Sequence, residues 1–171
     1  MAANHGASNG IWLRIFKKDS GEITVTYAEA VEEALCFGWI DGQANKYDDV
    51  SYIQRFTPRR PKSIWSKRNT DIVERLIGEG KMTKVGMEQV ALAKADGRWH
   101  QAYDSPANMK VPEDFLHLLS KHKKAKAFFD GLNKTNQYAI AWRLQTAKKP
   151  ETREKRLKEI LEMMKERKKF H

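Results

Sequence analysis

The chain has very little cysteine and no long apolar run. Its one cysteine, Cys36, excludes a disulfide within the chain and favours a reducing compartment. No apolar run approaches ~18 residues, the shortest length that spans a bilayer, and the densest apolar stretch, Ala34–Ile40, is far shorter. Residues Met1–Gly10 lack the basic and apolar regions of a secretory signal. These absences predict a cytoplasmic protein without a membrane span.

Patterns typical of metal or catalytic sites are also missing. The five histidines form no pair at metal-ligand spacing, and none stands beside a second cysteine. There is no G-x-S-x-G elbow, and Gly78–Gly80 lacks the Lys-Ser/Thr that completes a phosphate-binding loop. Cys36 lies between Leu35 and Phe37 and is interpreted as a small buried apolar residue. The sequence therefore predicts no metal ion and no cofactor, and it favours a protein that is not an enzyme.

Charge is distributed unevenly along the chain. Residues 1–120 contain 16 Lys and Arg and 16 Asp and Glu, whereas residues 121–171 contain 16 and 6, which accounts for the whole net charge of +10. Clustered positive charge attracts polyanions within a Debye length of ~8 Å. Two interpretations stay open, a solvated set of ion-paired helices or a nucleic-acid-binding surface. The candidate residues for the second are Lys148, Lys149, Arg153, Arg156, Lys168 and Lys169.

The first half of the chain mixes strand and helix patterns. Apolar residues alternate over 11–16, which predicts a strand, and Ile23–Val25 predicts a second short one. Thr26 and Glu29 have the spacing of a capping box, so we expect a helix that ends near Gly38. Further along we expect strands at 39–45 and 50–57 that pair with each other, a helix capped by Asn69 or Thr70 that runs to Gly78, and a helix over 83–96.

Everything after Pro112 has the pattern of helices. The last helix is expected to begin near Pro150, and its apolar face follows an i, i+3, i+4, i+7 spacing. The preceding helix is expected to pack through Tyr138, Ala141, Trp142 and Gln145. The predicted fold is α+β, with a small, mostly antiparallel sheet and helices in the N-terminal part and only helices in the C-terminal part. We expect an α+β domain at 1–97, a linker at 98–112 and a basic helical region at 113–171.

One group of residues has the chemistry of an anion site. Arginine grips carboxylate or phosphate with two parallel hydrogen bonds, serine hydroxyls add donors, and indole rings offer flat faces. The alternative interpretation, in which the arginines pair with nearby aspartates and both tryptophans lie in the core, also stays open. The candidate ligand-binding residues are Trp39, Asp41, Arg55, Arg59, Arg60, Ser63, Trp65 and Ser66.

Several segments of the chain resemble the bacterial YdeI/OmpD-associated (OmdA, "bacteriocin-protection") family. The likeness runs over about Gly10–Lys169. It implies a small bacterial protein with an α+β N-terminal part and a helical OmdA-type C-terminal region, and it implies no catalytic residue or cofactor. The segments that carry it are Tyr27–Val31, Phe37–Gly42, Phe56–Arg60, Ser63–Ser66 and Ala147–Arg153.

Together these observations predict a non-enzymatic binding or stress-protection protein that holds an anionic small molecule. The first alternative is binding of nucleic acid or another polyanion by the basic C-terminal helices. The second is an enzyme that uses Asp41 as a base beside an arginine clamp. The third is a protein partner that docks on an exposed apolar face such as Leu157–Met164.

Overall fold

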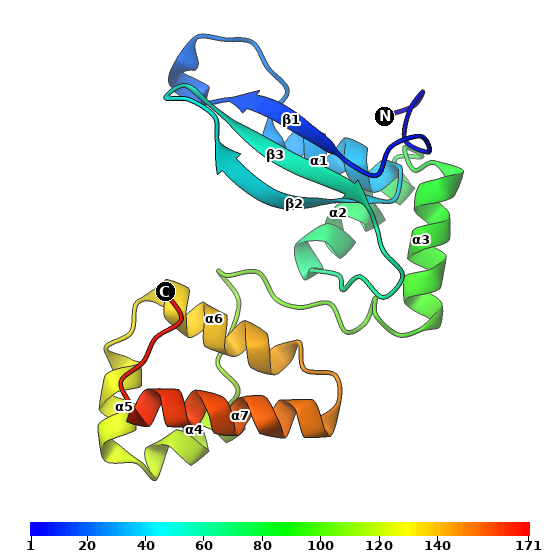
Figure 1. Ribbon diagram of the computed structural model, residues 1–171. Helices are drawn as coiled ribbons and strands as arrows, with labels where there is room; N and C mark the ends of the chain where they lie inside the picture. The colour runs from blue at the N-terminus through cyan, green and yellow to red at the C-terminus, as the bar shows by residue number, and fades with distance from the viewer. The chain divides into compact units, whose positions relative to one another are not determined.

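The computed structural model describes residues 1–171 and divides into two compact units. Met1–Ala102 forms the first, here called the sheet unit, and Tyr103–His171 forms the second, the helical unit (Figure 1). The expected α+β fold is confirmed, because all strands lie in the sheet unit and the helical unit contains only helices.

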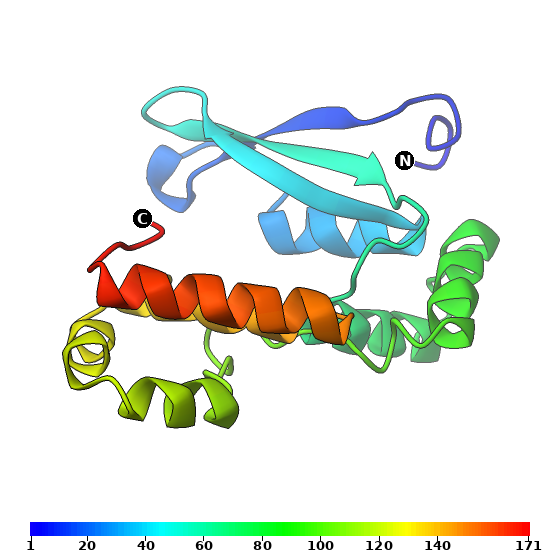
Figure 2. The same cartoon turned by 60° about the horizontal axis from the view of Figure 1, so that its bottom comes forward.

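Three antiparallel strands form the sheet, in the order β1-β3-β2. The helix α1 packs along one face of this sheet, and no helix of the sheet unit covers the other (Figure 2). The expected pairing of the two later strands is confirmed, and the first strand joins them on the free edge of β3. The elements of the sheet unit are β1 (Ile11–Phe16), a short 3-10 helix η1 (Lys18–Ser20), α1 (Tyr27–Cys36), β2 (Trp39–Lys46), β3 (Ser51–Pro58), α2 (Lys67–Gly78) and α3 (Lys84–Ala95).

The two faces of the sheet differ in burial. Residues that pair directly across strands point to the same face. Ile15, Trp39 and Phe56 are buried, and they belong to the face beneath which α1 lies, here called the inner face. Trp12 and Arg14 alternate with the half-buried Leu13 and the buried Ile15 of β1 and point the opposite way, to the outer face.

Local signals set where α1 begins, as the sequence predicts. The Thr26 hydroxyl accepts a hydrogen bond from the Glu29 backbone N–H, and the Glu29 carboxylate accepts one from the Thr26 backbone N–H. Hydrogen bonds to the Glu29 carboxylate from the Thr26 backbone N–H, and then from the Thr26 hydroxyl, hold the pKa of Glu29 below its usual value. The strand expected at Ile23–Val25 is wrong, because this segment is an extended loop with Ile23 fully exposed. β-branched residues favour an extended backbone, but a strand also needs a partner, and none pairs here.

The helix α2 begins earlier than the sequence indicates. Ser66 caps it by accepting a hydrogen bond from the Asn69 backbone N–H, so Asn69 and Thr70 lie buried inside the first turn rather than at the cap. The helix expected over 83–96 is confirmed as α3, and the Thr83 hydroxyl caps it by accepting a hydrogen bond from the Gly86 backbone N–H. The α3 backbone approaches the end of α1 so closely that a Cβ on Gly86 would lie 2.2 Å from the carbonyl oxygen of Cys36, whose side chain is buried.

The helical unit packs four helices around one core. As expected, the last helix begins at Pro150, and its predicted apolar face is buried. The helices are α4 (Glu113–Ser120), α5 (Lys123–Asp130), α6 (Lys134–Gln145) and α7 (Pro150–Lys165). The core residues are Phe115, Leu119, Ala125, Phe129, Ile140, Leu144, Ile160, Leu161 and Met164.

The face expected for α6 needs correction. Gln145 is exposed and Trp142 half-buried, whereas Asn136, Ile140 and Leu144 are fully buried. Because α6 is buried over a broad band, its apolar periodicity points to no single face. Asn136 is a polar residue among these buried apolar ones. Its side-chain amide forms hydrogen bonds with the backbone of residues 170 and 171 and with the side chain of the α6 cap at residue 133, which no sequence pattern reveals.

Candidate ligand-binding site

The two tryptophans of the predicted anion site lie in the core. Trp39 and Trp65 are each 2% exposed, so neither ring offers a face to a ligand. The Trp65 ring packs against Trp99, with 4.9 Å between the ring centroids. The Arg59 guanidinium carbon lies 3.4 Å from the centroid of the Trp65 ring. Both indole rings therefore belong to the core, as in the alternative interpretation of the sequence.

The loop after β3 uses most of its polar groups to hold itself together. Arg59 is 7% exposed and donates a hydrogen bond from Nη1 to the Ile64 carbonyl oxygen. The Ser63 hydroxyl accepts from the Arg60 backbone N–H, and the Ser66 hydroxyl caps α2. Arg59, Ser63 and Ser66 therefore shape the loop, while the Arg60 side chain is exposed.

Asp41 lies on the inner face of the sheet. Its carboxylate accepts a hydrogen bond of 2.7 Å from the Tyr27 hydroxyl of α1. Burial first, and then this hydrogen bond to a carboxylate, raise the pKa of Tyr27. Asp41 pairs directly with Phe56, so Arg55, the next residue on β3, points to the opposite face. The structure does not bring Arg55 and Asp41 together, and Arg55 cannot clamp a substrate held at Asp41.

Arg55 instead lies on the outer face beside Trp12. The two residues are direct partners in the β1–β3 ladder, and the guanidinium carbon is 5.5 Å from the centroid of the indole ring. Trp12 is 42% exposed. Arg55 is half-buried, yet its guanidinium makes no hydrogen bond or ion pair within the protein. An accessible ring thus lies next to a cation without a counter-ion.

A β-bulge in β2 positions Arg55. Two residues, Gly42 and Gln43, lie opposite Arg55 where regular pairing would place one. The Gln54 side chain, only 4% exposed, supports the bulge from the inner face, because its amide donates to the carbonyl oxygens of Gly42 at 2.8 Å and of Arg55 at 3.2 Å. Bulges are common near functional sites because they redirect a side chain and strengthen the local twist.

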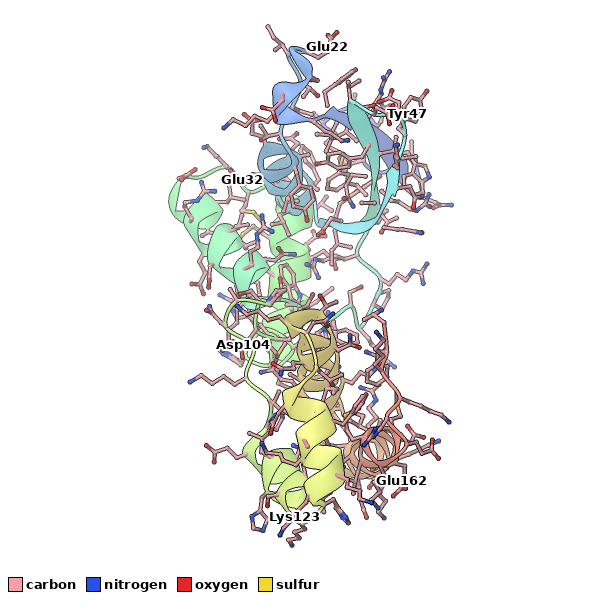
Figure 3. The ribbon with its side chains drawn as sticks, turned by 90° about the vertical axis from the view of Figure 1, so that its left-hand side faces the viewer. Glu22, Glu32, Tyr47, Asp104, Lys123 and Glu162 are labelled. Atoms are coloured by element: carbon pink, nitrogen blue, oxygen red, sulfur yellow. The ribbon has the colours of Figure 1, made fainter.

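A second group of aromatic side chains lies farther along the outer face. The Arg14 guanidinium carbon is 4.4 Å from the Phe16 ring centroid and 4.6 Å from that of Tyr47. Figure 3 shows Tyr47 on the side of the sheet away from the α1 residue Glu32, and 59% of Tyr47 is exposed. Arg14 also forms an ion pair of 2.7 Å with Asp48. Hydrogen bonding by the Ser51 hydroxyl holds the pKa of that carboxyl below its usual value, so the pair stays charged.

In the sequence, the outward residues of β1 indicate only a strand. The alternation over 11–16 was sufficient to place Trp12, Arg14 and Phe16 on one face. This alternation does not identify the partner strand. Arg55 joins the outer face through the pairing of β1 with β3, and Tyr47 joins it through the turn between β2 and β3.

The candidate residues of the basic alternative belong to the helical unit, which contains 17 Lys and Arg against 9 Asp and Glu. Arg153 pairs with Asp114, Lys168 pairs with Glu166 at 2.8 Å, and Arg156 donates to the Arg143 carbonyl oxygen. The side chains of the remaining candidates, Lys148, Lys149 and Lys169, are exposed. The group is therefore partly engaged in ion pairs and helix capping and partly solvated.

No cluster of three or more His, Cys, Asp or Glu side chains in the chain is suited to hold a metal ion. None of the helices combines the length and apolar character needed to cross a bilayer.

Two family models match the chain. Residues 1–89, just over half of the chain, match "Domain of unknown function (DUF8412)". Residues 108–167 match "Bacteriocin-protection, YdeI or OmpD-Associated" (OmdA). Of the segments that suggested the resemblance, Ala147–Arg153 lies within the OmdA match and the other four lie within residues 1–89.

No curated protein and no solved structure shows significant similarity to the chain. Because the DUF8412 model matches more than half of the chain, the chain belongs to that family, and its residues 108–167 match the YdeI/OmpD-associated model that the sequence resemblance suggested.

Proposed function

We propose that the protein is a non-enzymatic binding protein whose outer sheet face holds a ligand with an anionic group and a flat ring. The observation that supports this is the Arg55 guanidinium, half-buried beside the exposed ring of Trp12 and without a counter-ion. Of the predicted candidates, Arg55 keeps this role, whereas Trp12 replaces the two buried tryptophans as the stacking surface.

Arginine suits this role because its planar fork of N–H donors matches the oxygens of a carboxylate or a phosphate. Burial removes part of its hydration, so an incoming anion displaces less water than it would at a free surface. The neighbouring indole adds stacking area for a ring and an attraction between its π face and a cation. A ligand that joins an anion to an aromatic ring can therefore bind the guanidinium and stack on the indole at the same time.

Titration with adenosine 5′-monophosphate and with inorganic phosphate tests the proposal. We expect the nucleotide to bind more tightly than phosphate, because only the nucleotide has a ring to stack on Trp12. Replacing Arg55 with Ala removes the charge-assisted hydrogen bonds and is expected to weaken nucleotide binding by about 1.4 kcal/mol or more, which is about tenfold. Lys84→Ala is the matched control, since Lys84 is exposed and lies on α3. Equal affinity in the Arg55→Ala variant and the control would overturn the proposal.

A second candidate function is polyanion binding by the helical unit, supported by its excess of 17 basic over 9 acidic residues. Duplex DNA is the probe. If the exposed lysines contact phosphates, log K should fall with log salt by ~0.9 for each phosphate neutralised. Replacing Lys148 and Lys149 with Ala should reduce the steepness of that salt dependence. An unchanged slope would show that these two lysines do not contact the DNA phosphates.

A further inference from the structure

The outer face carries two separate places where an aromatic ring meets an arginine. The first, here called the Trp12 station, consists of Trp12 and Arg55. The second, the Tyr47 station, consists of Arg14, Phe16 and Tyr47. Trp12 and Phe16 are four residues apart on β1, and a strand rises ~3.3 Å per residue, so the stations lie ~13 Å apart. A ligand that contacts both stations is therefore extended.

The two stations differ in charge. At the Tyr47 station the Arg14 charge is compensated by Asp48, with 2.7 Å between the guanidinium and the carboxylate. At the Trp12 station Arg55 has no such partner. The face thus offers a ring at each station but a free positive charge at only one, so the ligand needs flat groups at both stations and an anion near Trp12.

We infer that this face binds single-stranded nucleic acid, with one base stacked on Trp12, another on Tyr47, and a phosphate held by Arg55. This inference rests on the proposed function and names its substrate class. Single strands repeat a flat ring and an anion along an extended backbone, and proteins bind them by stacking bases on aromatic side chains. A duplex keeps its base faces stacked inside the helix, so it cannot use the rings of an open sheet face.

The charge difference gives the inference a quantitative signature. With Arg55 as the one uncompensated contact, the slope of log K against log salt for a single strand is expected to be about −0.7. Binding by the basic helices would give a much steeper slope because more phosphates are neutralised. Stacking tolerates every base, so affinity should depend little on sequence.

The experiment is a fluorescence-anisotropy titration of the full chain with a labelled oligothymidylate of about ten nucleotides, within the length that single-strand-binding modules cover. Trp12→Ala and Tyr47→Ala each remove one stacking ring and are expected to weaken binding by about fivefold or more. Leu92→Ala is the matched control, because Leu92 is a large apolar residue on α3 that is also exposed. Thermal unfolding of each variant verifies that the fold is intact.

The outcomes distinguish a failure of the inference from a failure of the proposed function. If adenosine 5′-monophosphate binds through Arg55 but Tyr47→Ala leaves oligothymidylate affinity unchanged, the inference is overturned and the proposed function stands. If neither ligand responds to Arg55→Ala, both are overturned. If duplex DNA binds as tightly as the single strand with a steep salt slope and the aromatic variants bind normally, the inference is overturned in favour of the helical unit. Loss of affinity in both aromatic variants with a shallow salt slope supports the inference.

Discussion

The two faces of the same three-stranded sheet carry similar residue types in opposite environments. On the inner face Trp39 is buried, and the Asp41 carboxylate is bonded to a protein donor. On the outer face Trp12 and Tyr47 are exposed, and Arg55 has no hydrogen bond or ion pair within the protein. The residue type alone therefore does not distinguish structure from binding. What distinguishes them is whether each polar group already has a partner.

This comparison predicts two different phenotypes. Substitutions on the inner face should lower the free energy of unfolding, whereas those on the outer face should lower ligand affinity and leave stability nearly unchanged.

The largest effect is expected from Trp39→Ala on the inner face. The ring is 2% exposed, so its removal leaves a cavity in the core of the sheet unit and should cost about 3–5 kcal/mol of unfolding free energy. Chemical denaturation followed by circular dichroism measures this cost. A loss below about 1 kcal/mol would mean that the ring is not packed as the structure shows.

Gln54→Ala is expected to affect both faces. It removes the buried amide that bonds the carbonyl oxygens of Gly42 and Arg55, which should cost about 1–3 kcal/mol of stability. Because the bulge positions Arg55, nucleotide affinity should fall as well. Gln54 is thus a positioning residue that acts on the ligand through Arg55. Gln43→Ala is the control, since Gln43 lies in the same bulge with an exposed side chain. Normal nucleotide affinity in the Gln54→Ala variant would show that the bulge does not contribute to ligand binding.

Tyr27→Phe is expected to have a smaller effect that depends on pH. Near neutral pH the loss of the hydrogen bond to Asp41 should cost about 1 kcal/mol. Burial and that hydrogen bond raise the pKa of Tyr27 in the folded state above its unfolded value of 10.0. The folded state therefore retains this proton more strongly, and the linked stability is complete below pH 10 and is lost as the pH rises above it.

Urea denaturation of both proteins from neutral pH to about pH 11 tests this linkage. Stability of the original chain should fall more steeply above pH 10 than that of Tyr27→Phe, which has no phenol to titrate. Parallel curves for the two proteins would show that Tyr27 titrates equally in the folded and unfolded states.

The smallest stability effect is expected from Trp12→Ala on the outer face. The ring is 42% exposed, so the free energy of unfolding should stay within about 0.5 kcal/mol of the original value. Denaturation under the conditions used for Trp39→Ala gives a direct comparison of two tryptophans on opposite faces. A loss comparable to that of Trp39→Ala would remove the distinction between the faces.

Features that depend on neighbouring residues were predictable from the sequence. The Thr26–Glu29 capping box and the alternation of β1 each need only a few consecutive residues, and both are confirmed. Ile23–Val25 fails because a strand also requires a distant partner.

The candidate site was less predictable because it depends on contacts between distant residues. The burial of Trp65 follows from its packing on Trp99 and Arg59. Arg59 is near Trp65 in the sequence, but Trp99 is distant. The separation of Arg55 from Asp41 follows from the register of β2 on β3, which no local pattern reveals.

The most direct test of the account is a nuclear magnetic resonance titration that observes the indole N–H signals of all five tryptophans while adenosine 5′-monophosphate is added. We expect the Trp12 signal to move with saturation and the signals of buried Trp39 and Trp65 to stay in place. A stationary Trp12 signal, or movement of the Trp142 signal of the helical unit alone, would contradict it.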